Sequence, residues 1–215
     1  MSGLFITIEG GEGVGKSTQA RLLAERLRAA GATVLEVREP GGTPTGDRIR
    51  AILLDPSVTM EPRTELFLYE AARAELTATV IVPALARGEV VVCDRFFDSS
   101  TAYQGHGRGL GADTVRDLNL AATGGVRPDL TVLLDLETGE ALRRATTGGA
   151  DRIEAESLDF HRAVIAGFAG IAAAEPLRVV RVDASGTVEE VAECVWAAVG
   201  AHPAGERATG RRAQS

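Results

Sequence analysis

A glycine-rich segment near the N-terminus has the spacing of a phosphate-binding loop. Residues 10–17 read Gly-Gly-Glu-Gly-Val-Gly-Lys-Ser and match the pattern G-x-x-x-x-G-K-[ST]. Glycines let the backbone curl so that its N–H groups converge on phosphate oxygens, and the N-terminus of a following helix adds positive charge. The alternative, a glycine-rich turn with no ligand, is disfavoured by the apolar strand before the loop and the helical pattern after it. We therefore expect the β- and γ-phosphates of a nucleotide to bind at this loop, through Gly10, Gly11, Glu12, Gly13, Val14, Gly15, Lys16, Ser17 and Thr18.

The composition of the chain singles out the lysine of this loop. Of the 23 basic residues, 22 are arginine, and the one lysine is Lys16. A compact ammonium on a flexible stem fits a phosphate cradle, whereas a planar guanidinium does not. Lys16 is thus predicted to neutralise phosphate charge during catalysis, and the Ser17 hydroxyl to bind Mg²⁺.

Short apolar runs rich in β-branched residues alternate with longer helical patterns along the chain. The runs are Leu4–Glu9, Thr33–Arg38, Glu89–Asp94, Leu130–Asp135 and Arg178–Asp183. Such alternation is typical of a parallel sheet with helices on both faces. We predict an α/β fold of the P-loop NTPase type, with three α/β/α layers, about five parallel strands and a mobile lid.

Several predicted strands end in a charged residue. In an open α/β sheet the carboxyl ends of the strands line the ligand crevice, although polar residues also mark strands that simply emerge into water. Glu9 and Asp94 end two of these strands. Carboxylate oxygens suit Mg²⁺, so both are candidates for its ligands, and Asp94 could also pair with Arg95.

The remaining patterns outline one domain with a tail. Apolar residues spaced by three and four predict a long core helix between the second and third strands, and Thr187-Val-Glu-Glu190 predicts a capping box for the last helix. We expect a kinase domain over residues 1–200 and a disordered tail over 201–215, where the sequence shows no periodicity. The stripe of the long helix comprises Phe67, Ala71, Ala74, Ala78, Ile81 and Leu85.

Charge and cysteine usage limit the possible partners and compartment. The net charge of −7 argues against a general nucleic-acid or anionic-membrane binder, and no apolar stretch approaches the ~20 residues that span a bilayer. The two distant cysteines, Cys93 and Cys194, are predicted to be free thiols, which suits a cytoplasmic protein.

A phosphate loop by itself leaves GTPases, other ATPases and small-molecule kinases open. A guanine site would need an Asn-Lys-x-Asp run, but Asn119 is the only asparagine and Leu120 follows it. A nucleotide kinase needs a second anion pocket opposite the first, and arginines suit it. Arg38, Arg73 and Arg95 are candidates for that pocket.

Six separate motifs of the sequence, taken in order, resemble those of a known family. Arg38-Glu-Pro-Gly-Gly-Thr, Ala71-Ala-Arg73, Asp94-Arg-Phe96, the run from Ser99 to Gly109, Arg127-Pro-Asp-Leu and Asp151-Arg-Ile-Glu154 occur in the order found in bacterial thymidylate kinases. The resemblance covers roughly residues 4–199. It implies transfer of the γ-phosphoryl group of ATP to dTMP, with Mg²⁺, in a homodimer.

The resemblance also implies roles for individual residues. Arg38 and Arg95 would hold the substrate phosphate, Arg73 would bond the pyrimidine edge, and Tyr69 would stack on thymine unless it is only a core aromatic. The other residues that match substrate contacts are Pro40 at the thymine methyl, Ser100 and Gln104 at the base, Tyr103 against a ribose 2′-hydroxyl, and Glu12 at the 3′-hydroxyl.

The segment at about 143–153 departs from the family pattern. It occupies the place of the lid, but Thr146, Thr147, Gly148 and Gly149 stand where some relatives have catalytic arginines, and the phosphate loop has none either. Arg144 and Arg152 are the remaining catalytic candidates, and Arg143 or Arg144 is expected to lie near adenine, unless all three are solvated loop residues. A kinase for another nucleoside monophosphate or a deoxynucleoside, or a catalytically weak nucleotide-binding protein, therefore stays possible.

Overall fold

A sheet of five parallel strands forms the centre of the computed structural model, which describes residues 3–145 and 151–205. The strand order is β2-β3-β1-β4-β5. Each strand begins within one residue of its predicted start, and all five end where the sequence indicated. The strands are β1 (Leu4–Glu9), β2 (Val34–Arg38), β3 (Val90–Asp94), β4 (Leu130–Asp135) and β5 (Val179–Asp183).

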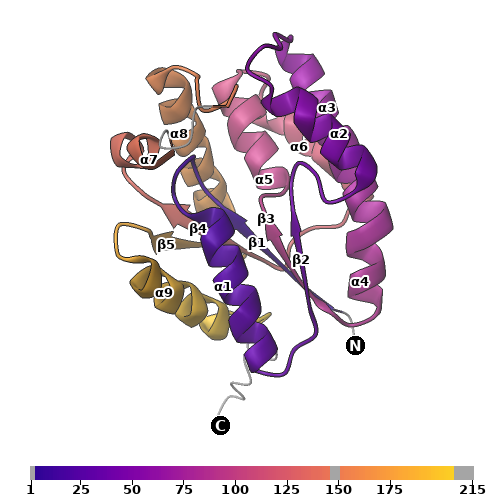
Figure 1. The fold of residues 1–215 in the computed structure, drawn as a ribbon, viewed down its shortest axis with the longest axis vertical. Coiled ribbons are helices and arrows are strands. Elements are labelled where there is room, and N and C mark those ends of the chain that lie inside the picture. Colours follow the sequence, from indigo (N-terminus) through magenta and orange to yellow (C-terminus); the bar gives the residue numbers. More distant parts are fainter. Residues whose placement is uncertain (1–2, 146–150, 206–215) are drawn as a thin grey trace.

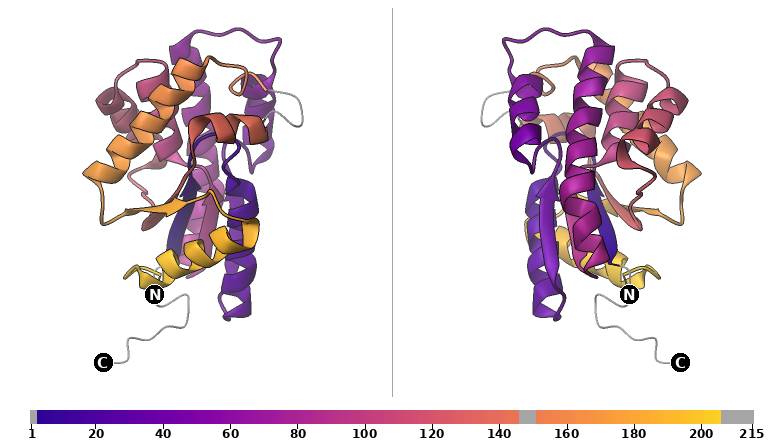
Figure 2. Two further views of the ribbon diagram at one scale, coloured as in Figure 1. Left: turned by 90° about the vertical axis from the view of Figure 1, so that its left-hand side faces the viewer. Right: turned by 90° about the vertical axis from the view of Figure 1, so that its right-hand side faces the viewer.

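Helices cover both faces of this sheet, so the predicted three-layer α/β/α architecture is confirmed (Figure 2). The helices α1 and α9 pack on one face, whereas the chain from α3 to α4, with α5, η2 and α8, packs on the other. Near the carboxyl ends of the strands, α7 and α8 lie on one side and α2 and α3 on the other (Figure 1). The elements are α1 (Lys16–Ala29), α2 (Pro44–Leu54), α3 (Pro62–Leu76), the π-helical turn η1 (Thr77–Ile81), α4 (Val82–Ala86), α5 (Phe97–Ser100), the π-helical segment η2 (Thr101–Gly107), α6 (Ala112–Thr123), α7 (Thr138–Ala145), α8 (Leu158–Ala174) and α9 (Val188–Ala201).

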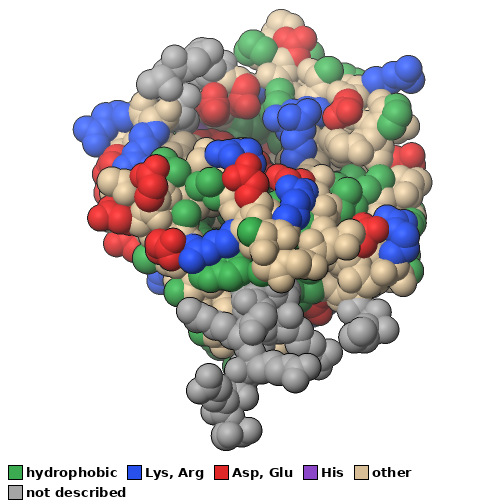
Figure 3. All heavy atoms as spheres, turned by 60° about the horizontal axis from the view of Figure 1, so that its bottom comes forward, with side chains coloured by type: hydrophobic (Ala, Val, Ile, Leu, Met, Phe, Trp, Pro, Cys, Tyr) green, Lys and Arg blue, Asp and Glu red, His purple; other side chains and the backbone are tan. Residues whose placement is uncertain are grey.

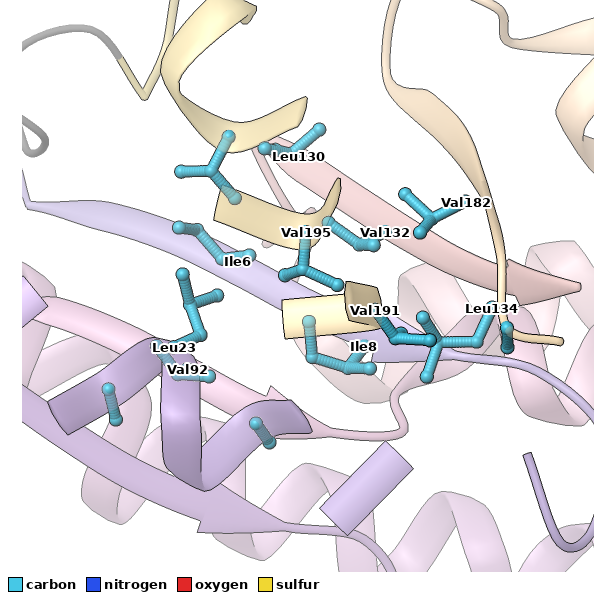
Figure 4. Packing of buried hydrophobic residues seen from close by; sticks show 14 of the residues in the cluster. Ile6, Ile8, Leu23, Val92, Leu130, Val132, Leu134, Val182, Val191 and Val195 are labelled. Carbon is cyan, nitrogen blue, oxygen red and sulfur yellow. The ribbon is translucent and has the colours of Figure 1, made fainter. Parts of the chain in front are cut away.

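Successive residues of the central strands bury opposite faces of the sheet. Ile6 and Ile8 of β1 pack toward α1 and α9, while Phe5 packs toward the other layer against Phe96. Because both faces are covered, the strand reads as a continuous apolar run. Figure 4 shows the first of these clusters, in which Val191 of α9 lies over the strands. This packing fixes the strand ends from which the loops of the site emerge.

The long helix predicted between the second and third strands exists, but the expected stripe is not its core face. It runs through α3, η1 and α4. Ile81 is buried as expected, whereas Phe67 is 56% exposed and Ala71 and Ala78 are exposed. In α3 the buried face contains Leu66 and Leu76 together with polar residues such as Arg73, so it is not the predicted apolar stripe. The π-helical turn follows α3 and changes the helical phase only from residue 77 onward. The result is an exposed apolar strip on the outer side of α3.

The C-terminal part of the chain is ordered further than predicted. The capping box at Thr187 and Glu190 is present and begins α9, although Val188 is 48% exposed. His202 hydrogen bonds through Nε2 to the Leu177 carbonyl at 2.7 Å, so the prediction of disorder is wrong for residues 201–205. Residues 206–215 lie outside the described residues, as do lid residues 146–150.

The surface carries both signs of charge side by side. On the face shown in Figure 3, basic and acidic side chains alternate without a large area of one sign. Cys93 is buried, Cys194 is exposed, and both are free, as predicted. Within residues 3–145 and 151–205, no helix is both long and apolar enough to cross a bilayer.

Candidate active site

A cavity of about 390 Å³ opens at the carboxyl ends of β1, β2 and β3. Residues from both predicted anion sites line it, including Lys16 of the phosphate loop and Arg38 after β2. The structure therefore brings together motifs that are far apart in the sequence. The other lining residues are Glu12, Gly13, Gly15, Ser17, Thr18, Glu39, Pro40, Arg50, Leu54, Tyr69, Arg73, Asp94, Arg95, Phe96, Ser99, Ser100, Tyr103, Gln104, Asp151, Ile153 and Glu154.

The phosphate loop joins β1 to α1 through backbone conformations that favour glycine. Gly13 and Gly15 have φ values of 70° and 89°, in the left-handed region. A Cβ atom at Gly10 would lie 2.6 Å from the Leu134 carbonyl oxygen, so this position also excludes a side chain. The N-terminus of α1 has no side-chain cap, which leaves its first N–H groups to bind an anion.

Lys16 is held inside the loop rather than in solvent. Its side chain is 8% exposed, and Nζ donates to the Gly11 carbonyl oxygen and lies 4.0 Å from the Glu12 carboxylate. Burial lowers the pKa of Lys16 to about 8, aided by the positive charge of Arg95 and opposed by nearby carboxylates. A bound triphosphate would add negative charge beside the ammonium and favour its protonated form.

Arg95 connects the phosphate loop with the opposite wall of the cavity. Its backbone has a φ of 67°, a rare conformation for a residue with a side chain and one that persists where the surroundings impose it. The guanidinium donates to Glu12 at 2.7 Å, Gly10 O at 3.0 Å, Ser99 Oγ at 3.1 Å and Tyr103 Oη at 3.2 Å. These contacts fix one cation between the two predicted anion sites.

Glu12 is a buried carboxylate among cations. It accepts hydrogen bonds from Arg95 and, at 2.7 Å, from Tyr103 Oη. Burial opposes ionisation, but the charges of Arg95 and Lys16 outweigh it and lower the pKa of Glu12 to about 2. The side chain is therefore an acceptor at neutral pH, beside the ring of Tyr103.

Two arginines face the cavity from the β2 side. Arg38 is 60% exposed and lies 3.9 Å from its carboxylate partner Asp47. Arg50 of α2 donates to the Pro40 carbonyl at 2.9 Å and has no ion pair within the described parts of the chain. Burial, together with the positive charge of Arg38, lowers the pKa of Arg50. Two like charges at one wall are poised to bind an anion.

The sequence reasoning did not single out Arg50. It lies in α2, whose start is marked by the Thr43 cap and Pro44, and it follows Arg38 by 12 residues. Only the packing of α2 beside the end of β2 brings the two guanidinium groups to one cavity. No local motif carries that information.

Arg73 lines the cavity but is already fully engaged by the protein. The side chain is 1% exposed, and all five N–H donors bond to protein oxygens. The predicted contact with a base edge would thus require one donor to be shared. The acceptors are Glu39 Oε2 at 2.9 Å, Glu70 Oε1 at 2.6 Å, Asn119 Oδ1 at 2.8 Å, Phe96 O at 3.3 Å and Ser100 Oγ at 3.0 Å.

The remaining residues predicted to contact substrate also line this cavity. Tyr69 is half-buried and Pro40 lies after β2, while Ser100 and Gln104 are buried in the opposite wall. Burial raises the pKa of the Tyr69 phenol, so it is neutral. The shared location agrees with a single pocket for the second substrate, although the roles stay predictions.

The geometry of Ser17 and Asp94 fits a divalent cation. The Ser17 hydroxyl donates to Asp94 Oδ2, and Asp94 Oδ1 is buried without a hydrogen-bond partner. Both supply hard oxygen ligands at the cavity wall, and Mg²⁺ in kinases needs few protein ligands because phosphates and water complete its shell. No cluster of three or more His, Cys, Asp or Glu suited to a metal occurs within the described residues.

Glu9 does not share this position. It is fully buried, is absent from the cavity wall, and accepts from the Phe96 N–H at 2.7 Å and the Ser99 hydroxyl at 2.6 Å. Both carboxylate oxygens therefore hold the loop after β3, and the geometry gives no support to the predicted metal role. Burial raises the pKa of Glu9 to about 7, with the nearby negative charge of Asp98 adding to the effect.

The arginines proposed for the lid lie away from the cavity wall. Arg144 bonds to Glu140 and, at 3.3 Å, to the Ala184 carbonyl, and Arg143 is exposed. Arg152 points to Glu65 at 2.6 Å and to the Leu53 carbonyl at 2.8 Å, while its neighbours Asp151 and Glu154 line the cavity. In this structure Arg152 forms an ion pair with Glu65 outside the cavity wall, so its predicted catalytic role is not supported.

A parallel α/β/α sheet with a phosphate loop after β1, facing a second cluster of arginines across one cavity, defines the class of P-loop nucleotide kinases. A sequence model of the family described as thymidylate kinase matches residues 8–195. The chain belongs to the thymidylate kinase family.

Individual relatives agree over nearly the whole chain. It is 54% identical over 198 residues to a thymidylate kinase of Synechococcus sp. (strain JA-3-3Ab), covering 91% of this chain and 95% of the relative. It is 52% identical to a thymidylate kinase of Deinococcus radiodurans, with coverages of 92% and 96%. The crystal structure of thymidylate kinase from Ehrlichia chaffeensis superposes with a TM-score of 0.77 at 32% identity, covering 93% of this chain and 99% of that one.

Proposed function

We propose that this protein transfers the γ-phosphoryl group of ATP to dTMP and releases dTDP and ADP. The observation that carries the proposal is the single cavity in which Lys16 of the phosphate loop and the Arg38–Arg50 pair face each other. Such an arrangement holds a triphosphate and a monophosphate in one pocket. Family membership supplies the identity of the nucleotides.

Positioning and charge neutralisation supply the catalysis. A phosphate oxygen of dTMP is already ionised at neutral pH, so its attack on the γ-phosphorus needs no general base. Lys16 and Arg95 place positive charge where the transferred group collects negative charge. Ser17 and Asp94 would hold Mg²⁺, which neutralises phosphate charge when bound.

The same pocket gives the proposed contacts for the nucleoside. Glu12, ionised and beside Tyr103, would accept a hydrogen bond from the sugar 3′-hydroxyl. The Tyr103 ring, fixed by Arg95 at 5.0 Å, would exclude a 2′-hydroxyl. Tyr69 would stack on the base, with Pro40 at its methyl group and Ser100 and Gln104 at its edge.

We further propose that the protein is a cytoplasmic homodimer. The exposed face of α3 carries Phe67, 56% exposed, next to Ala71, and Val82 of α4 is 41% exposed. An exposed apolar strip on a long helix is typical of a subunit interface. Two free thiols suit a reducing compartment.

A coupled assay of ADP release tests the reaction. The purified chain, with ATP and Mg²⁺, is offered dTMP, dUMP, dCMP, dAMP, AMP and thymidine in turn. Preference for dTMP supports the proposal, whereas preference for another acceptor identifies a different nucleotide kinase. Binding of ATP and dTMP without dTDP formation would show a nucleotide-binding protein without catalysis.

A further inference from the structure

A buried carboxylate outside the cavity wall accepts a hydrogen bond from one of the residues in that wall. Glu65, in the first turn of α3, is 1% exposed. Its Oε1 accepts from Gln104 Nε2 at 2.8 Å and from Arg108 Nε at 3.1 Å, and its Oε2 accepts from Arg108 at 2.9 Å and Arg152 at 2.6 Å. Gln104 is 1% exposed and lines the cavity, whereas Glu65 does not.

The charge of Glu65 decides which end of the Gln104 amide faces it. Burial by itself would raise the pKa of Glu65, but hydrogen bonds from Arg108 and Gln104 outweigh it and hold the pKa below its ordinary value. An ionised carboxylate can only accept hydrogen bonds, so Gln104 must turn its NH₂ group toward Glu65. The amide oxygen is then the atom left for the cavity.

Resting on the proposed function, we propose that Glu65 is a positioning residue that makes Gln104 present a hydrogen-bond acceptor to the base, and so selects thymine over cytosine. The N3 position of thymine carries a proton and donates, whereas N3 of cytosine is an acceptor. The fixed oxygen of Gln104 accepts a hydrogen bond from the N3–H group of thymine and repels the N3 lone pair of cytosine. Uracil has the same N3–H group as thymine, so this contact does not discriminate between dTMP and dUMP.

The surroundings keep Gln104 from reversing its amide. Two guanidinium groups converge on Glu65, from Arg108 after η2 and from Arg152 beside α2. Reversal would place the Gln104 oxygen against the carboxylate and leave the NH₂ group facing the cavity, at the cost of a buried hydrogen bond. A glutamine without a charged partner lacks this constraint, because either end of its amide can then adapt to the ligand.

The test is the ratio of kcat/KM for dTMP to kcat/KM for dCMP in Glu65→Gln. Two arginines donate to Oε2 at 2.9 and 2.6 Å, whereas only Arg108 Nε, at 3.1 Å, donates to Oε1 beside Gln104, so the oxygen of the new amide is expected at the Oε2 position. The new NH₂ group then faces Gln104 and turns its amide around, at the cost of the weaker Arg108 Nε contact. The ratio is expected to fall about 10- to 100-fold, as for a lost and mismatched hydrogen bond, while the KM for ATP stays unchanged. A ratio equal to that of the wild type overturns the proposal, because a merely structural defect lowers both substrates alike.

Glu156→Gln is the matched control. Glu156 pairs with the same Arg108 at 2.6 Å but does not touch Gln104, so its ratio should equal that of the wild type. A fall in this control as large as in Glu65→Gln attributes the effect to Arg108 and overturns the proposal. A wild-type protein that does not phosphorylate dTMP instead overturns the proposed function.

A double variant provides a rescue. In Glu65→Gln/Gln104→Glu the new amide at position 65 donates to the new carboxylate at 104, which offers only acceptors to the cavity. The preference for dTMP should return, and its failure to return in a folded double variant counts against the proposal.

If the variants do not fold, a measurement on the wild-type protein tests the orientation of the Gln104 amide. The side-chain NH₂ signals of Gln104, assigned by their loss in Gln104→Met, should include one slowly exchanging proton, bonded to Glu65, that dTMP leaves in place. Fast exchange of both protons overturns the proposal.

Discussion

The guanidinium of Arg95 lies 2.7 Å from the carboxylate of Glu12, so an arginine of the second anion site is paired with an acid of the phosphate loop. Both side chains are about one-sixth exposed, at 16% and 17%. Breaking this pair from one side leaves a largely buried charge without its partner.

We expect Arg95→Met to lower the free energy of unfolding by about 3 kcal/mol, because Glu12 keeps a charge that only Lys16, at 4.0 Å, then balances. Arg95→Met/Glu12→Gln should recover at least half of that loss, since it removes the stranded charge as well. Neither variant should regain activity. Urea unfolding measures both, and a double variant no more stable than the single one contradicts the pairing.

Glu9 should make stability depend on pH. Its carboxyl has a pKa of about 7 in the folded chain against an ordinary value of 4.5. Between these values the folded chain binds more protons than the unfolded chain, so stability falls as the pH rises. Glu9→Gln does not titrate, and its unfolding free energy relative to the wild type should rise across that window by on the order of 3 kcal/mol.

Glu61→Gln, on the exposed start of α3, removes one carboxyl group from the surface and is the control for the pH series. A Glu9→Gln curve parallel to the wild type would show that the pKa of Glu9 is the same in the folded and unfolded chain, and would contradict the prediction.

Arg50→Ala should raise the KM for dTMP about 10- to 100-fold and leave the KM for ATP unchanged, because a hydrogen bond to a charged group is lost at one anion site only. Arg48→Ala, two residues earlier in the same helix but outside the cavity, is the control and should behave as the wild type. Equal effects of the two substitutions would place Arg50 outside the substrate site.

Phe67→Glu should convert the proposed dimer to monomers, since it puts a charge in the apolar strip of α3. Leu177→Glu changes an apolar residue that is 88% exposed elsewhere and should leave the assembly intact. Sedimentation velocity distinguishes the two masses, and a Phe67→Glu dimer would move the interface to another surface.

Lys16→Ala should lower kcat by roughly 10²–10³-fold or more, as expected when a preorganised positive group at the reacting phosphate is lost. Its thermal unfolding should remain cooperative, because removing a buried cation with a lowered pKa strands no strong ion pair. Lys16→Arg should be almost as inactive, since a guanidinium does not fit the cradle. High activity of either variant would refute the assignment of the loop.

The sequence by itself determined those parts of this protein that depend on interactions between residues close together in the chain. The strands follow from runs of apolar residues, the phosphate loop from glycines that alone tolerate its backbone, and the capping box from a spacing of three residues within one turn. In each case the deciding interactions lie within a few residues of each other, so the pattern is visible in the chain.

Only the tertiary structure decided which side chains share the cavity and which form hydrogen bonds or ion pairs with other residues of the protein. Glu9 accepts a hydrogen bond from Ser99, Arg152 forms an ion pair with Glu65, and Arg50 lines the same cavity as Arg38. Packing also left Phe67 at the surface, because the buried face of α3 carries polar residues such as Glu70 and Arg73 beside its apolar ones. These outcomes depend on how distant segments pack, because a buried charge pairs with the opposite charge or hydrogen-bond donor that the fold places beside it. The spacing of residues along the chain does not predict which partner that is.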